Sequence, residues 1–142
     1  MNTSFWLLFL IVTSLSTSQQ TPRLPTPVES GLQAYQTSGA TAAVRSWLAD
    51  SPLASQRDLL NKTVAEFKAI EQTYGAFSSY EVLGIKSFGQ RSLRCYLVLQ
   101  YEKGPVFIYF DSYRTAKRWT VTGFLFNTKA DLILSSGFFE VH

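Results

Sequence analysis

The chain has 142 residues, of which 46% are hydrophobic and 16% are charged, and its formal net charge is +3. This composition is typical of one globular domain and excludes a disordered or membrane-embedded chain. The basic residues are scattered, apart from Arg114, Lys117 and Arg118 beside a predicted turn. Because the dense basic stripe of a nucleic-acid-binding protein is missing, we expect no nucleic-acid partner.

Residues 1–18 have the pattern of a signal peptide. An apolar run at residues 5–12 is followed by small residues up to Ser18, as at a signal-peptidase site. The run is shorter than the roughly 20 apolar residues that a spanning helix needs, so we expect no stable membrane span. We therefore expect export to the periplasm or the medium after cleavage, with an uncleaved N-terminal anchor as the alternative. Residues 19–25 are polar and contain proline, which predicts a flexible leading segment.

The single cysteine, Cys95, excludes an intramolecular disulfide. It lies far from the predicted cleavage point, which excludes lipidation there. Leu93, Cys95, Leu97 and Leu99 alternate along one run, so we interpret Cys95 as a small buried hydrophobic residue rather than a reactive thiol.

Three helices are predicted before residue 76. The first begins with Thr26 as N-cap and Pro27 at the first helical position, and it ends at Gly39. The second covers residues 41–50. The third starts with a capping box at residues 55–58 and ends at Gly75. Its apolar positions follow the helical period from Leu60 onward.

Four strands are predicted in the second half, at residues 80–85, 91–101, 106–113 and 118–127. Their short connections indicate an antiparallel meander. Strands of this length must twist and curl to cover short helices. The sequence therefore predicts an α+β fold in which N-terminal helices pack on a curved four-stranded antiparallel sheet.

Residues 129–134 are predicted as a helical turn or a short strand. Residues 135–142 are predicted as a tail that either packs back through Phe138 and Phe139 or stays unpacked.

Both faces of the predicted strands are apolar. Leu97 and Leu99 alternate with Tyr96 and Val98 on the second strand, and the third strand shows the same pattern. On the fourth strand, simple alternation places Trp119, Val121 and Leu125 opposite Phe124 and Phe126. Helices from the first half can cover only one face. We therefore expect a homodimer through the outer sheet face.

Turn and core motifs carry a resemblance to a known superfamily. They are Ser38-Gly39, Leu53 after Ser51-Pro52, and the strand ending at residues 119–127 with its aromatic residues. Residues 28–127 resemble the NTF2-like (cystatin-like) α+β cone, and in particular small exported bacterial proteins of unknown function in that superfamily. The resemblance implies one NTF2-like domain at residues 26–134. It leaves the function open, because the superfamily contains both enzymes and binding modules.

The sequence offers one candidate pocket. NTF2-like enzymes place an Asp or a Tyr inside the cone, and the resemblance suggests that role for four residues of neighbouring strands, namely Asp111, Tyr109, Tyr96 and Arg94. The alternative is that Asp111 is paired with an Arg or solvated and that the tyrosines only fill the sheet.

No other catalytic constellation is present in the sequence. The one histidine is His142, and there is no metal-ligand spacing or phosphate-binding loop. We therefore name no catalytic residue and expect no metal and no cofactor. The favoured hypothesis is a non-enzymatic binding or protein-interaction module. The alternative is a small-molecule enzyme or carrier of the isomerase or dehydratase type, with a small apolar ligand in the cone.

Overall fold

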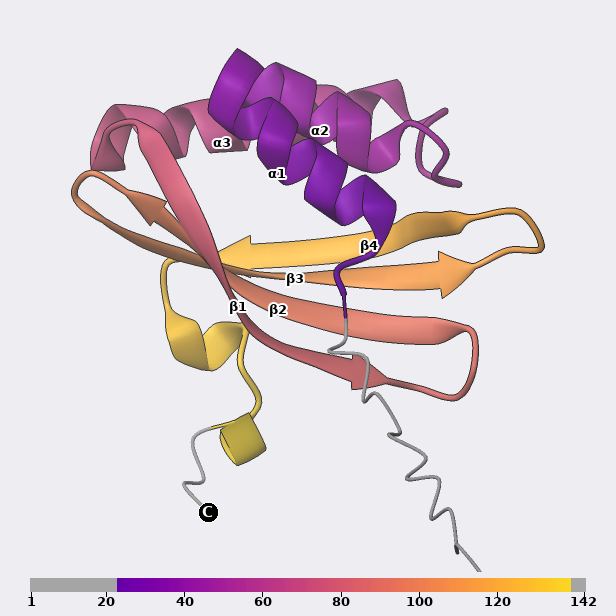
Figure 1. The fold of residues 1–142 in the computed structure, drawn as a ribbon. Coiled ribbons are helices and arrows are strands. Elements are labelled where there is room, and N and C mark those ends of the chain that lie inside the picture. Colours follow the sequence, from indigo (N-terminus) through magenta and orange to yellow (C-terminus); the bar gives the residue numbers. More distant parts are fainter. Residues whose placement is uncertain (1–22, 139–142) are drawn as a thin grey trace, which may run out of the picture.

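The computed structural model describes residues 23–138, and the chain there folds into helices on one face of a sheet (Figure 1). Three helices precede a four-stranded antiparallel sheet of order β1-β2-β3-β4, which confirms the predicted α+β class. The predicted signal peptide, residues 19–22 and residues 139–142 lie outside the described part. No helix within residues 23–138 combines the length and the apolar character of a membrane span.

The first and third helices end at the predicted glycines, whereas the second ends two residues before the predicted residue 50. They are α1 (Thr26–Ser38), α2 (Ala40–Leu48) and α3 (Arg57–Tyr74). Gly39 and Gly75 adopt φ values of 88° and 83°, and their amides donate back to Tyr35 and Glu71. Both glycines therefore end a helix through the left-handed conformation that other residues avoid.

Both predicted N-caps are wrong. The N-cap of α1 is Pro25 rather than Thr26, and the N-cap of α3 is Gln56 rather than Ser55; neither makes a side-chain capping bond. The carbonyl of Pro25 already accepts the amide of Glu29, and that of Gln56 accepts the amide of Leu60. Backbone bonding thus starts each helix at a residue that carries no capping hydroxyl.

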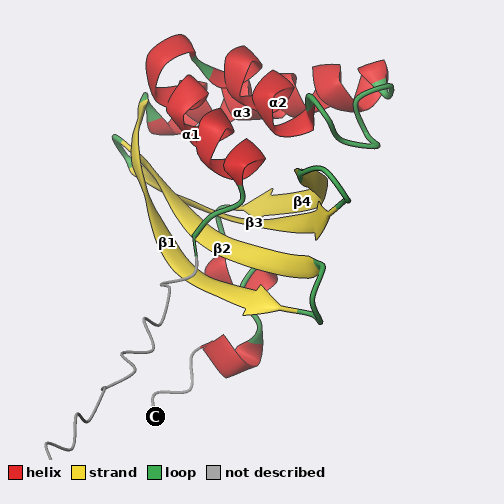
Figure 2. Cartoon of the chain, turned by 45° about the vertical axis from the view of Figure 1, so that its right-hand side comes forward, coloured by secondary structure: helices red, strands yellow, loops and turns green. Residues whose placement is uncertain are grey.

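The strands are β1 (Phe77–Ser87), β2 (Ser92–Tyr101), β3 (Gly104–Arg114) and β4 (Trp119–Asn127). The sheet curves beneath the helices, as Figure 2 shows. On β2, Cys95, Leu97 and Leu99 are fully buried against the helices. We call the opposite side of the sheet, which points away from the three helices, the outer face.

A register shift in β4 corrects the predicted faces of that strand. Asp111 pairs with Gly123 but Ser112 pairs with Val121, so one residue of β4 is extra at this point. Such a bulge changes the phase of the alternation. Phe124 and Phe126 therefore join Val121 in the core beneath the helices. Leu125 points to the outer face and is 49% exposed.

Aromatic rings fill the space between the helices and the sheet. Trp47 and Phe67 are both 0% exposed, with ring centroids 5.5 Å apart. Trp47 also lies 5.0 Å from the ring of Phe110, and its Nε1–H donates to the carbonyl of Val28 at 3.3 Å. These large side chains pack directly on β3 and β4, where an open cone would place its ligand.

After β4, the chain crosses to the outer face of the sheet. Residues 130–138, here called the C-terminal segment, contain two short 3-10 helices, Ala130–Leu132 and Ser136–Phe138. In Figure 1 they lie on the side of the sheet opposite the three helices. Ile133 and Leu134 are 5% and 6% exposed and form a second small core with Tyr96. The predicted helical turn is therefore present, and Phe138 of the predicted tail packs back onto the sheet.

Candidate functional site

The four residues proposed from the sequence all lie on the outer face. Arg94 pairs with Asp111 and Tyr96 pairs with Tyr109 across β2 and β3. Between them, Cys95 and its partner Phe110 point toward the helices. The structure therefore brings the four residues together on one face, but outside the space between the helices and the sheet.

Arg94 and Asp111 form a bidentate ion pair. Arg94 Nε donates to Asp111 Oδ1 at 2.7 Å and Nη2 donates to Oδ2 at 2.8 Å. The guanidinium also lies over the ring of Tyr109, 3.9 Å from its centroid. The hydrogen bonds to Asp111 are the main reason that the pKa of Arg94 is raised.

This geometry gives Asp111 a structural role. Both of its oxygens accept an N–H from Arg94, and such charge-assisted pairs fix their partners in one orientation. A general base must instead reach the proton of a substrate. The observed pair matches the alternative in which Asp111 is bound to an arginine.

An open groove runs along the outer face beside this ion pair. It has a volume of about 430 Å³ and is lined by Phe88, Ser92, Leu93, Arg94, Asp111, Ser112, Tyr113 and Thr122. Phe88 and Tyr113 are 52% and 39% exposed. The guanidinium of Arg91 lies 5.4 Å from the centroid of the Tyr113 ring. The groove is therefore aromatic at its rim and carries a neutralised ion pair.

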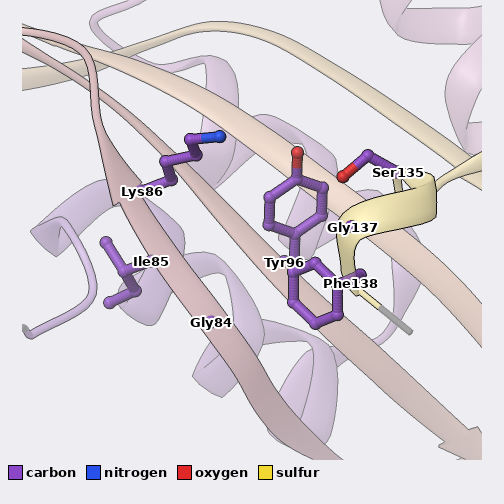
Figure 3. A pocket seen from close by; sticks show the side chains of 7 residues that line it. All are labelled: Gly84, Ile85, Lys86, Tyr96, Ser135, Gly137 and Phe138. Atoms are coloured by element: carbon purple, nitrogen blue, oxygen red, sulfur yellow. The ribbon is translucent and has the colours of Figure 1, made fainter. Parts of the chain in front are cut away.

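A separate pocket lies between the C-terminal segment and the outer face (Figure 3). It has a volume of about 350 Å³ and is lined by Gly84, Ile85, Lys86, Tyr96, Ser135, Gly137 and Phe138. The rings of Tyr96 and Phe138 meet edge to face, with centroids 4.9 Å apart. A Cβ atom at residue 84 would lie 3.1 Å from the Phe138 ring, so the close approach of the segment depends on Gly84.

Sequence reasoning identified Tyr96 but missed the rest of this pocket. Lys86 is at the end of β1, while Ser135 and Phe138 come from the C-terminal segment. Neither the end of β1 nor the C-terminal segment carries a recognisable motif by itself. The one available signal was the aromatic pair Phe138-Phe139 in the tail, which is consistent with a segment that returns to the sheet.

The buried thiol agrees with its interpretation from the sequence. Cys95 is 0% exposed, and burial raises its pKa to about 12. A thiol with this pKa is a poor nucleophile at neutral pH. In the part of the chain that the structure describes, His, Cys, Asp and Glu side chains form no group of three or more that could hold a metal ion.

The observed arrangement of three helices and a four-stranded antiparallel sheet is compatible with an NTF2-like cone. In the comparisons with known proteins, no family model, no curated protein and no solved structure matches the chain.

Proposed function

We propose that this chain is an exported, non-enzymatic binding module of the NTF2-like type that self-associates through the uncovered part of its outer sheet face. The observation that carries the proposal is the set of exposed apolar side chains there. Phe88, Tyr113 and Leu125 are 52%, 39% and 49% exposed. The C-terminal segment contacts Tyr96, Phe107 and Tyr109 and leaves these three side chains accessible.

The packing of the core favours this proposal over an enzyme or carrier that works inside the cone. Such an activity needs a cavity with convergent polar groups between the helices and the sheet. Trp47 and Phe67 occupy that space and are fully buried. The order of the helices and strands supports the NTF2-like assignment. The two buried phenols of the core, Tyr35 and Tyr101, are hydrogen-bonded to each other at 3.0 Å.

The uncovered surface has the features of a contact between two copies. Protein interfaces are enriched in aromatic residues and arginine and poor in unpaired charge. Arg94 and Asp111 neutralise each other within the surface, and the cationic groups of Lys86 and Arg91 lie over the rings of Phe88 and Tyr113. A two-fold contact uses the same patch on both subunits, which this aromatic surface permits.

Sedimentation velocity over a range of concentrations tests self-association. The wild-type chain should dimerise at micromolar concentration. Leu125→Glu should weaken the dimer by about tenfold or more, because it places a charge in an apolar contact. The matched control is Val82→Glu: Val82 is 45% exposed, but it pairs with Leu97 on the helix-facing side of the sheet. A wild-type monomer throughout, or equal effects of both variants, would contradict the proposal.

Export is a separate part of the proposal and rests on the apolar run at residues 5–12 and the small residues that follow. Mass spectrometry of the protein recovered outside the cytoplasm should find a mature N-terminus close to residue 19. A protein that stays in the cytoplasm with its first residues intact would refute export without affecting the binding surface.

A further inference from the structure

We propose that the pocket beneath the C-terminal segment binds a small amphiphilic carboxylate, with the head group at Lys86 and the apolar body against the wall formed by Tyr96 and Phe138. The proposal rests on the assignment of the chain as a binding module but not on its self-association. It adds a ligand class and a second site to that assignment.

The walls of the pocket suit an apolar ligand body. The rings of Tyr96 and Phe138 stand edge to face and form one apolar wall. The backbone at Gly84 allows Phe138 to approach closely. The volume of about 350 Å³ lies near the lower end of the range of small-molecule sites. A short alkyl or aromatic body therefore fits better than a large ligand.

The polar groups of the pocket are all able to donate hydrogen bonds. Lys86 contributes an ammonium, and Tyr96 and Ser135 contribute hydroxyls; all three line the pocket. In Figure 3 these three polar ends point toward the same end of the pocket. None of the lining residues is acidic. An ammonium with two adjacent hydroxyls matches the two acceptor oxygens of a carboxylate.

Within residues 23–138, no acidic side chain is paired with Lys86. Arg94 lies opposite Lys86 in the sheet, but Asp111 already neutralises it. The Nζ of Lys86 lies 5.9 Å from the centroid of the Phe88 ring. A ligand anion would therefore meet a net positive charge beside an apolar wall.

Octanoate and octanol form a matched pair of probes, because they share an apolar chain and differ in the charge of the head group. In an NMR titration of the full chain, octanoate should shift the amide signals of Gly84, Ile85 and Phe138. Octanoate should bind about tenfold more tightly than octanol, because the charged head gains a charge-assisted hydrogen bond. Equal affinity for the two probes, or binding of neither, would overturn the proposal.

Three variants assign the effect to named residues. Lys86→Met should lower octanoate affinity about tenfold and leave octanol affinity unchanged, and Lys86→Arg should retain most of the preference for the anion. Phe138→Ala should lower the affinity for both probes. Lys68→Met, at an exposed lysine on α3, is the control and should change neither. An equal loss in Lys68→Met and Lys86→Met would reduce the effect to general electrostatics. Sedimentation of the same samples reports self-association independently.

Discussion

Tyr96 on β2 and Phe138 at the end of the C-terminal segment meet edge to face, with ring centroids 4.9 Å apart and an angle of 60° between the rings. Through this contact the chain covers part of its own outer face. Ile133 and Leu134 add to the same small core. The apolar pattern on both sides of the strands therefore has two explanations: part of the outer face packs against the chain's own C-terminal segment, and the remainder is exposed.

The substitution Gly84→Val tests the docking of the C-terminal segment. A Cβ atom at residue 84 would lie 3.1 Å from the Phe138 ring, so a branched side chain should displace that ring. We expect faster amide hydrogen exchange at Ile133 and Leu134, measured by mass spectrometry or NMR. The midpoint of unfolding should not fall comparably, because valine is favourable in a strand.

Gly123→Ala is the control for this experiment. Gly123 also lies on the outer side of the sheet, but its Cβ would be 4.0 Å from Asp111 Oδ2, an ordinary contact. Exchange at residues 133–134 should stay at the wild-type rate. Unchanged exchange in Gly84→Val would mean that the segment does not need the close approach at Gly84.

Gly31→Ala should destabilise the protein although it lies within a helix. Replacing glycine by alanine in a helix ordinarily stabilises it by up to about 1 kcal/mol. Here the new Cβ would lie only 2.0 Å from Trp47 Cδ1. The indole is fully buried and hydrogen-bonded to Val28, so it cannot move freely. We expect a loss of about 2–3 kcal/mol in the free energy of unfolding, measured in urea.

Ser30→Ala provides the comparison on the same helix. Ser30 is exposed, so the change should be neutral or stabilising by a few tenths of a kcal/mol, roughly the difference in helix propensity. A Gly31→Ala variant as stable as Ser30→Ala would show that the Trp47 ring does not lie against α1 as described.

The sequence predicted those features that depend on local backbone chemistry. Gly39 and Gly75 end their helices because a positive φ favours glycine. The alternation of β2 correctly placed Cys95, Leu97 and Leu99 on one face, which the structure shows to be the core face. It also placed Arg94 and Asp111 on neighbouring strands and on the same face of the sheet. Because both faces of the sheet are apolar, the pattern could not show which face meets the helices.

Other features depend on packing that no local pattern encodes. The bulge opposite Asp111 and Ser112 changes the phase of β4, and composition alone does not mark its position. The pocket joins Lys86 to Ser135, so it exists only after the chain has returned to the outer face. Thr26 and Ser55 have the chemistry of N-caps, but backbone bonding begins at neighbouring residues instead.

The Arg94–Asp111 pair should contribute more to stability than the Arg118–Asp50 pair, which joins the turn before β4 to the chain just after α2. In a double-mutant cycle of Arg94→Met and Asp111→Asn, we expect a coupling energy of about 0.5–1 kcal/mol that falls with added salt. The control is Arg118–Asp50, where one N–O contact of 2.7 Å joins side chains that are both 56% exposed. Its coupling should be smaller. Equal couplings would contradict the idea that the bidentate geometry and the stacking on Tyr109 strengthen the first pair.

Alkaline pH should destabilise the protein through three buried acids. Burial raises the pKa of Cys95 from 9.0 to about 12 and that of Tyr101 from 10.0 to about 12, and it raises the pKa of Tyr35 above its ordinary value. The folded chain thus keeps protons that the unfolded chain releases. The stability from these groups is fully present below about pH 9 and is lost as the pH rises toward 12.

Urea unfolding at a series of pH values measures this loss. Each group that is ionised in the unfolded chain but still protonated in the folded chain should make the free energy of unfolding fall more steeply, by about 1.4 kcal/mol per pH unit. Tyr101→Phe should make the fall shallower above pH 10. At neutral pH the same variant should cost about 1 kcal/mol, because it removes one partner of the Tyr35–Tyr101 hydrogen bond of 3.0 Å. A free energy of unfolding that stays constant from pH 9 to 11 would mean that these side chains are accessible to solvent in the folded protein.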